Sequence, residues 1–208
     1  MAIKDIQERY RELGRIRLGQ KGAKGEPQKL DTFRLTSPKR VYLEAAGALY
    51  GGTVKTWDGA PSGEQWELIT DSNELDVLVP PQRITDTQAY ALWTAGGLQR
   101  RCDGTTQTNG EPCVCDAAER ECRPVTHLLV MLPQLPDLGV WRLTTTGFNA
   151  AAELPETVDL LVALTAAGRA LSAVLMIEHR TAKVKGVPHR FVVPTLGFTE
   201  SIDDLEVT

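Results

Sequence analysis

The chain has 208 residues, of which 42% are hydrophobic and 24% are charged. These proportions are ordinary for a globular protein, and the length allows one domain with a substantial core. With 23 Lys and Arg against 27 Asp and Glu, the formal net charge is -4. This balance excludes a protein that coats duplex DNA or an anionic membrane over its whole surface, but not a local basic patch.

No stretch of the sequence approaches the roughly 18 apolar residues that a membrane helix needs. The chain begins MAIKDIQERYRELGR, which is charged where a signal peptide has its apolar centre. We therefore expect a protein of the cytoplasm, with no membrane contact. Because cysteines stay reduced there, clustered thiols are expected to bind metal rather than to form disulfides.

The first part of the chain is basic. Residues 1–40 hold eleven Lys and Arg against five Asp and Glu, a local charge of +6. Ile6, Tyr10 and Leu13 have helical spacing, and the glycines from Gly14 to Gly25 interrupt any continuation. We predict that residues 1–29 form a flexible basic arm with a short helix. A solvated tail and an arm that contacts a partner or phosphate are equally consistent with this pattern.

A folded region is predicted to begin near Leu30. TFRLTS is typical of a short strand, and a helix should follow with Ser37 as its cap, Pro38 at its first position and Gly51-Gly52 at its end. The segments TVKTWDG and EQWELIT then predict a β-hairpin, with Trp57 and Trp66 as core or cross-strand partners.

The middle of the chain reads as further strands around a cysteine-rich segment. ELDVLVPP predicts a strand that the two prolines end, and THLLVMLP with GVWRLTTTG predicts a pair of strands. Between them, Thr85 to Leu98 is expected to form a short helix or an irregular segment that leads to the cysteines.

The last part combines a helix with a hairpin. Residues 154–167 have an apolar stripe, with Pro155 near the start and Gly168 placed to end the helix. RALSAVLMIEHRTAKV and HRFVVPTLGF predict a hairpin around Lys185-Gly186. Residues 199–208 form an acidic tail. The sequence thus predicts one α+β domain over residues 30–198, with a mixed or antiparallel sheet, a few helices and a small zinc-stabilised loop module at 99–124.

Four cysteines lie within 21 positions, with the spacing C-x10-C-x-C-x6-C: Cys102, Cys113, Cys115 and Cys122. The segment is rich in Gly, Asn, Asp and Pro and has little apolar material for a core. Four thiolates around one Zn²⁺ would hold such turns together, and with all four positions filled by protein the metal would be structural. Disulfide or redox chemistry and unliganded thiols are the alternatives.

The sequence indicates no catalytic site. His127, His179 and His189 lie on predicted strands among apolar residues, which is typical of core or sheet-edge histidines. None of the nucleophile, phosphate-binding or metalloprotease motifs is present. We therefore expect a protein that is not an enzyme, although a hydrolase with a dispersed site would escape this test.

The ordered segments KLDTFRLTS, LEAAGALYGG, WDGAP, QWELIT, LQRRCDG, PCVC and LPDLGVWRL resemble the recombination directionality factors of actinobacterial phages that use large serine integrases. The resemblance covers roughly residues 1–195. It implies a non-enzymatic protein that binds its cognate integrase on the coiled-coil side, at the attachment-site DNA in the bacterial host cell. It also implies a switch from integration (attP x attB) to excision (attL x attR), with little DNA binding by the factor itself.

Six residues from the basic arm, the rim of the zinc module and the aromatic residues expected to be exposed are candidates for contact with the partner: Arg15, Arg17, Tyr90, Trp93, Arg100 and Arg101. The alternative function is a zinc-containing nucleic-acid-binding protein of phage replication. It is favoured by the basic N-terminal segment and by the arginines that flank the cysteines.

Overall fold

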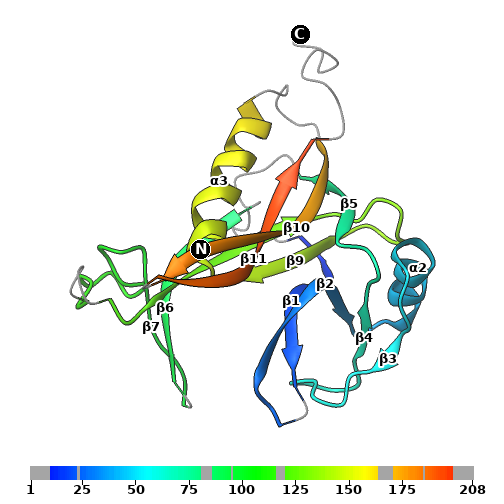
Figure 1. The fold of residues 1–208 in the computed structure, drawn as a ribbon, viewed down its shortest axis with the longest axis horizontal. Helices are drawn as coiled ribbons and strands as arrows, with labels where there is room; N and C mark the ends of the chain where they lie inside the picture. The colour runs from blue at the N-terminus through cyan, green and yellow to red at the C-terminus, as the bar shows by residue number, and fades with distance from the viewer. Residues whose placement is uncertain are drawn as a thin grey trace, which may run out of the picture.

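The computed structural model describes residues 10–22, 24–80, 86–94, 96–115, 120–163, 171–184 and 186–198. Within these ranges the protein is mostly β, with one eight-stranded sheet, one three-stranded sheet and two helices (Figure 1). The elements are β1 (Glu12–Lys21), β2 (Pro27–Ser37), α2 (Arg40–Tyr50), β3 (Lys55–Thr56), β4 (Trp66–Ile69), β5 (Glu74–Val79), β6 (Asp86–Thr94), β7 (Gly97–Cys102), β8 (Arg123–Val130), β9 (Val140–Thr145), α3 (Phe148–Ala163), β10 (Leu171–Val184) and β11 (Val187–Gly197).

The larger sheet has the strand order β3-β4-β2-β1-β9-β8-β6-β7. Its pairs are antiparallel except that β1 runs parallel to β9, so the sheet is mixed as predicted. Strands β8 and β9 alternate between buried and open positions, which is the pattern of a sheet with one face on the core. The side chains at the open positions of β8 and β9 therefore face away from the core and are available for contacts outside it.

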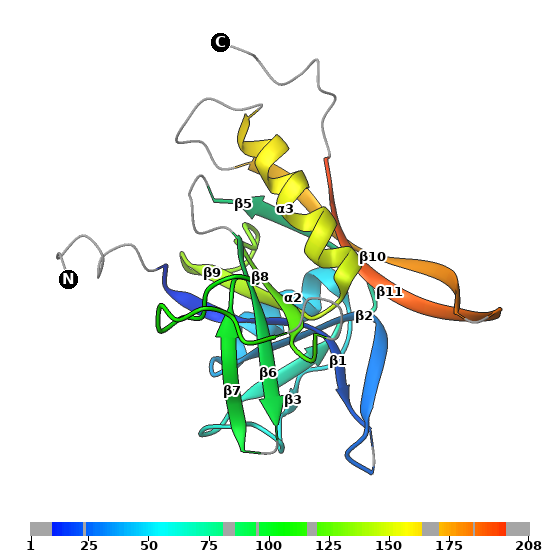
Figure 2. The same cartoon turned by 90° about the vertical axis from the view of Figure 1, so that its left-hand side faces the viewer.

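The smaller sheet has the order β11-β10-β5. Strands β10 and β11 form the hairpin that the sequence predicted, and Figure 2 shows it reaching out from the body of the molecule. A bridge between Leu78 and Met131 joins β5 to the chain just after β8, so the two sheets share one core.

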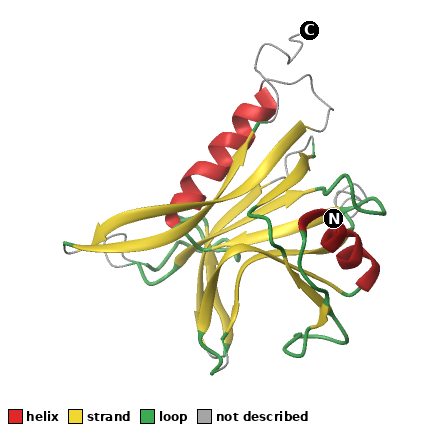
Figure 3. Cartoon of the chain, turned by 45° about the vertical axis from the view of Figure 1, so that its right-hand side comes forward, coloured by secondary structure: helices red, strands yellow, loops and turns green. Residues whose placement is uncertain are grey.

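The two helices cover separate flanks of the strands (Figure 3). Helix α2 packs on β2 and β4 through Tyr42, Leu43, Ala46 and Tyr50, and it ends at Gly51, as predicted. Helix α3 packs against β6, β8 and β11. Fully buried Trp141, Phe33 and Leu128 are among the large side chains between these layers.

The prediction of a flexible N-terminal arm is wrong for the described residues of the segment 1–29. Glu12–Lys21 is strand β1, and residues 27–29 belong to β2, so a hairpin crosses the expected boundary at residue 29. The spacing of Tyr10 and Leu13 was read as helical, but Leu13 and Ile16 are buried as part of a strand that pairs on both edges. Ile6 and the acidic tail at 199–208 lie outside the described residues.

Three other boundaries differ from the prediction. Residues 86–94 form strand β6, where a short helix or irregular segment was expected, because pairing with β7 and β8 outweighs weak local preference. Helix α2 begins at Arg40, and Ser37 instead ends β2, where its Oγ donates to the Leu13 carbonyl. Helix α3 begins at Phe148, so Pro155 lies inside it, and residues 164–170 lie outside the described part.

Candidate functional site

Arginines gather on the open face of the larger sheet. Ile16 of β1 and Trp141 and Leu143 of β9 point into the core, and strand alternation therefore turns Arg15, Arg17 and Arg142 to the other face. On β8, Arg123 and His127 share that face, because the intervening Pro124 and Thr126 are buried. The parallel register places Arg15 beside Arg142, and the next pair places His127 beside Thr144.

These side chains line a groove of about 730 Å³, which we call the cationic groove. Five of its lining residues are cationic and none is acidic: Arg15, Arg17, Lys29, Arg123 and Arg142. Trp93 of β6 and Val192 of β11 add apolar surface, and the Trp93 side chain is 65% exposed. The groove thus combines concentrated positive charge with an accessible indole.

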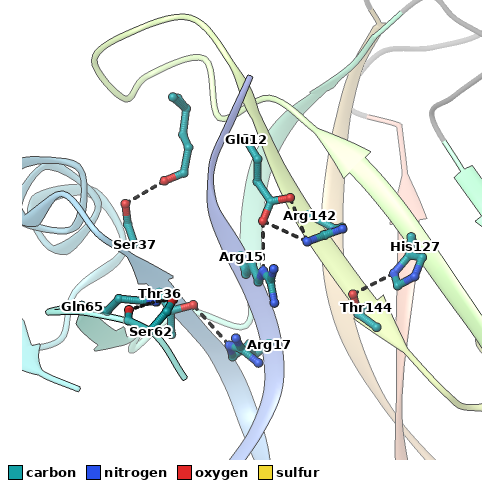
Figure 4. A network of polar contacts seen from close by, with 11 residues as sticks. Glu12, Arg15, Arg17, Thr36, Ser37, Ser62, Gln65, His127, Arg142 and Thr144 are labelled. Carbon is teal, nitrogen blue, oxygen red and sulfur yellow. Dashed lines mark hydrogen bonds and ion pairs between the residues drawn. The ribbon is translucent and has the colours of Figure 1, made fainter. Parts of the chain in front are cut away.

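Glu12 neutralises part of this charge from the end of β1. Its carboxylate lies 2.9 Å from Nε of Arg15 and 2.9 Å from Nη2 of Arg142, and Figure 4 marks both contacts with dashed lines. One carboxylate shared by two guanidinium groups leaves a net positive charge. It also holds both arginines in fixed positions on the sheet.

The other three cations of the groove have no carboxylate partner among the described residues. Arg17 donates to the hydroxyl of Thr36 at 3.2 Å, and no ion pair involves Lys29 or Arg123. The pKa of Arg17 is lowered, first by burial and then by repulsion from neighbouring arginines. An anion in the groove would relieve that repulsion.

His127 lines the same groove, and the positive charges of the nearby arginines act on its imidazole. Its Nδ1 is 2.9 Å from the hydroxyl of Thr144. Burial lowers the pKa of His127, and the charges of Arg142, Arg101 and Arg15 lower it further, while Glu12 opposes them. The imidazole is therefore neutral near neutral pH, and a bound anion would favour its protonation.

A second hollow of about 550 Å³ continues around β1 and shares Arg17 and Lys29 with the cationic groove. Trp57 lies there, with the guanidinium groups of Arg17 and Arg34 each 4.8 Å from its ring centroid. Arg34 is itself paired with Glu67. The Trp57 ring thus helps to hold Arg17 at the edge of the groove.

Of the six residues predicted to contact a partner, Arg15, Arg17 and Trp93 line the cationic groove. Arg101 lies on β7 close enough to His127 to lower its pKa. The remaining two have partners within the protein. Arg100 pairs with Glu121 at 3.2 Å, and the guanidinium of Arg120 lies 4.1 Å from the ring centroid of Tyr90.

Three cations of the groove were not among the six candidates: Lys29, Arg123 and Arg142. Arg142 was quoted within GVWRLTTTG, where it is the polar position between buried Trp141 and Leu143. This alternation could have indicated that Arg142 is available for contacts, since a charged residue between two core residues of a strand faces outward. What the sequence lacked was the order of the strands, which brings β1, β9 and β8 side by side.

The four cysteines also come together, between the end of β7 and the start of β8. The sulfur atoms of Cys102 and Cys113 are 3.5 Å apart, and those of Cys115 and Cys122 are 3.4 Å apart. All four are free thiols. This cluster lies in the segment that the sequence predicted to be a zinc module.

Cations beside an exposed indole form a surface that is suited to an anionic partner. The chain belongs to the Gp3-like family, described as recombination directionality factor-like, whose model matches residues 13–199. This family consists in general of non-catalytic regulators. No curated protein and no solved structure matches the chain. Among the described residues, no helix is long and apolar enough to cross a membrane.

Proposed function

We propose that this chain is a recombination directionality factor that binds its cognate large serine integrase in the bacterial host cell. It converts an enzyme that joins attP to attB into one that joins attL to attR. The observation that carries this proposal is the family match over residues 13–199. The factor itself performs no bond chemistry and acts by contact with integrase on attachment-site DNA.

The cationic groove is the surface that we assign to this contact. Its three cations without a carboxylate partner among the described residues line the same groove as an exposed tryptophan, and arginine and tryptophan are enriched at binding hot spots. The complementary surface on the integrase would be an acidic segment with an apolar residue that packs on Trp93. We place that segment in the coiled-coil region.

A factor of this kind works by shifting a population of complexes. It has to bind the integrase arrangement at the hybrid sites more tightly than the arrangement at the original sites, because equal affinity for both shifts nothing. Moving an equilibrium from 1:99 to 99:1 takes about 5.5 kcal/mol of differential binding. Contacts in a groove of this size, made in only one of two integrase conformations, can supply such a difference.

The test is recombination in vitro with purified integrase on paired hybrid sites and on paired original sites, each with and without the factor. We expect the factor to start excision and to suppress integration. If neither reaction changes at saturating factor, the proposal is wrong.

A second candidate, a nucleic-acid-binding protein of phage replication, is favoured by the five cations of the groove, because phosphates would fit them as well as carboxylates do. Gel retardation of single- and double-stranded DNA at low salt separates the two functions, since counterion release favours DNA binding most there. We expect little retardation by the factor alone. Strong retardation that needs no integrase would favour the second candidate.

A further inference from the structure

The loop between β7 and β8 has no hydrophobic core of its own. Between Cys102 and Cys122, none of the described residues is buried, whereas Cys102 is 4% exposed and Cys122 is 3% exposed. The loop is nevertheless folded back on itself by bridges between Cys102 and Gln107 and between Thr106 and Pro112. Its only buried side chains at either end are therefore thiols, so the thiols are the groups that can hold it together.

We propose that Cys102, Cys113, Cys115 and Cys122 bind one structural Zn²⁺ ion, which closes this loop. The four thiols form a connected set. Cys113 interacts with both Cys102 and Cys115, and Cys115 interacts with Cys122 as well. A ring of four soft sulfur ligands is the donor set that zinc prefers, and it leaves no open position for a bound water.

The distances between the sulfur atoms favour a metal over disulfides. At 3.4 and 3.5 Å, both pairs are well beyond the disulfide length of about 2.05 Å. Around a tetrahedral zinc with Zn–S bonds of about 2.3 Å, the sulfur atoms lie about 3.8 Å apart. No set of three or more His, Cys, Asp or Glu in the described residues is already arranged to hold a metal. Zinc binding therefore requires the two pairs to open by a few tenths of an ångström and turn toward one centre.

A positive charge lies beside the cluster. Four thiolates and one Zn²⁺ carry a net charge of about -2, which needs nearby compensation. Nη1 of Arg120 is buried and has no hydrogen-bond partner among the described residues. Nη2 of Arg120 donates to the carbonyl of Gly104 at 3.4 Å, next to the Cys102 side of the cluster. The guanidinium is therefore fixed at the place where a zinc tetrathiolate would need it.

The first test is the metal content of the full-length protein, purified without a metal-binding tag from cells grown with zinc. We expect about one zinc per chain. Replacing zinc with Co²⁺ should give the absorption of a tetrahedral cobalt thiolate. A protein without zinc that also fails to bind Co²⁺ would overturn the proposal, as would a mass lower by two hydrogens for each disulfide formed.

Matched variants then assign the ligands. Cys113→Ser should lose most of the zinc, while Val114→Ser should keep about one zinc per chain, because Val114 is 65% exposed between two ligands. A chelator should lower the melting temperature of the wild-type protein. Retention of zinc by Cys113→Ser would remove that residue from the site. These readouts need no integrase, so they stand or fall separately from the proposed function.

Discussion

Gly14 shows how one residue of β1 makes room for the largest side chain of the core. A Cβ at this position would lie 2.5 Å from Cζ3 of Trp141 and 2.6 Å from the carbonyl oxygen of Thr36. Trp141 is completely buried and cannot move aside cheaply. The same glycine that seemed to interrupt a helix in the sequence is therefore a close-packing position in a strand.

Gly14→Ala should destabilise the protein by about 1–3 kcal/mol, because the added methyl group forces either the Trp141 ring or β2 to shift. Denaturant unfolding measures the change. Gly96→Ala is the matched control, since its new Cβ would lie 3.7 Å from the nearest atoms, at ordinary contact distance. Equal stabilities of the two variants would contradict this explanation of the Gly14–Trp141 contact.

The lowered pKa of His127 predicts how folding stability depends on pH. The unfolded chain binds a proton at His127 near pH 6.5, but burial and the nearby arginines delay protonation in the folded protein. In the interval between the folded and unfolded pKa values, the unfolded state holds more protons. Stability therefore falls as the pH is lowered through this interval.

We expect the loss of melting temperature between about pH 7.5 and about pH 5.5 to be smaller in His127→Gln than in the wild-type protein. His189→Gln, which replaces an exposed histidine on β11, is the control for the loss of an imidazole elsewhere. An unchanged pH dependence in His127→Gln would contradict the lowering of the His127 pKa by burial and by the nearby arginines.

At the level of elements, helix α3 contains Pro155, and a neighbouring strand replaces the backbone hydrogen bond that this proline cannot make. Pro155 has no N–H to donate to the carbonyl of Ala151, one turn earlier. The side-chain amide of Gln88 on β6 donates to that carbonyl at 2.5 Å. A strand of the larger sheet thereby satisfies the backbone group that the proline leaves free, and the helix is tied to β6.

The hydrogen bond from Gln88 to the Ala151 carbonyl predicts that the effects of substitutions at Gln88 and Pro155 on unfolding free energy are coupled. Gln88→Leu should cost about 0.5–1.5 kcal/mol in the wild-type protein, because the Ala151 carbonyl loses its partner. In a Pro155→Ala background the helix regains its own hydrogen bond, so the cost of Gln88→Leu should be smaller. A double-mutant cycle of unfolding free energies measures this coupling, and strict additivity would refute it.

The elements that the sequence predicted correctly are those with strong local patterns. The hairpin of β10 and β11, the strands β4, β5, β8 and β9, and the glycine end of α2 all have clear alternation or turn residues. Strands β1 and β6 were missed for a different reason. Each pairs on one edge with the next strand along the chain, β2 or β7, and on the other edge with a strand much farther away in the sequence, β9 or β8.

At the level of the whole molecule, the net charge of -4 conceals a strongly positive face. The sequence alone pointed to Arg15, Arg17 and Trp93, but it treated the basic N-terminal segment as an arm apart from the fold. The groove exists because the parallel pairing of β1 with β9 inserts that segment into the sheet. No local pattern encodes a pairing between residues more than 120 positions apart, so the site could not be assembled without the topology.

The proposed zinc site differs from the groove in this respect. Its four ligands lie within 21 consecutive positions, so their spacing could be read directly from the sequence. The structure adds the short distances between the sulfur atoms and the nearby guanidinium of Arg120, which only the folded loop brings together.

Arg123→Glu tests most directly whether the cationic groove contacts integrase. Arg123 is exposed and has no ion pair among the described residues, so its reversal should leave the fold intact while it repels an acidic partner. The measurement is the affinity of wild-type and variant factor for integrase bound to hybrid-site DNA. We expect binding to weaken by at least about tenfold in Arg123→Glu. It should change little in Lys183→Glu, an exposed charge reversal on β10 outside the groove. Wild-type affinity in a folded Arg123→Glu protein would contradict the assignment of the groove.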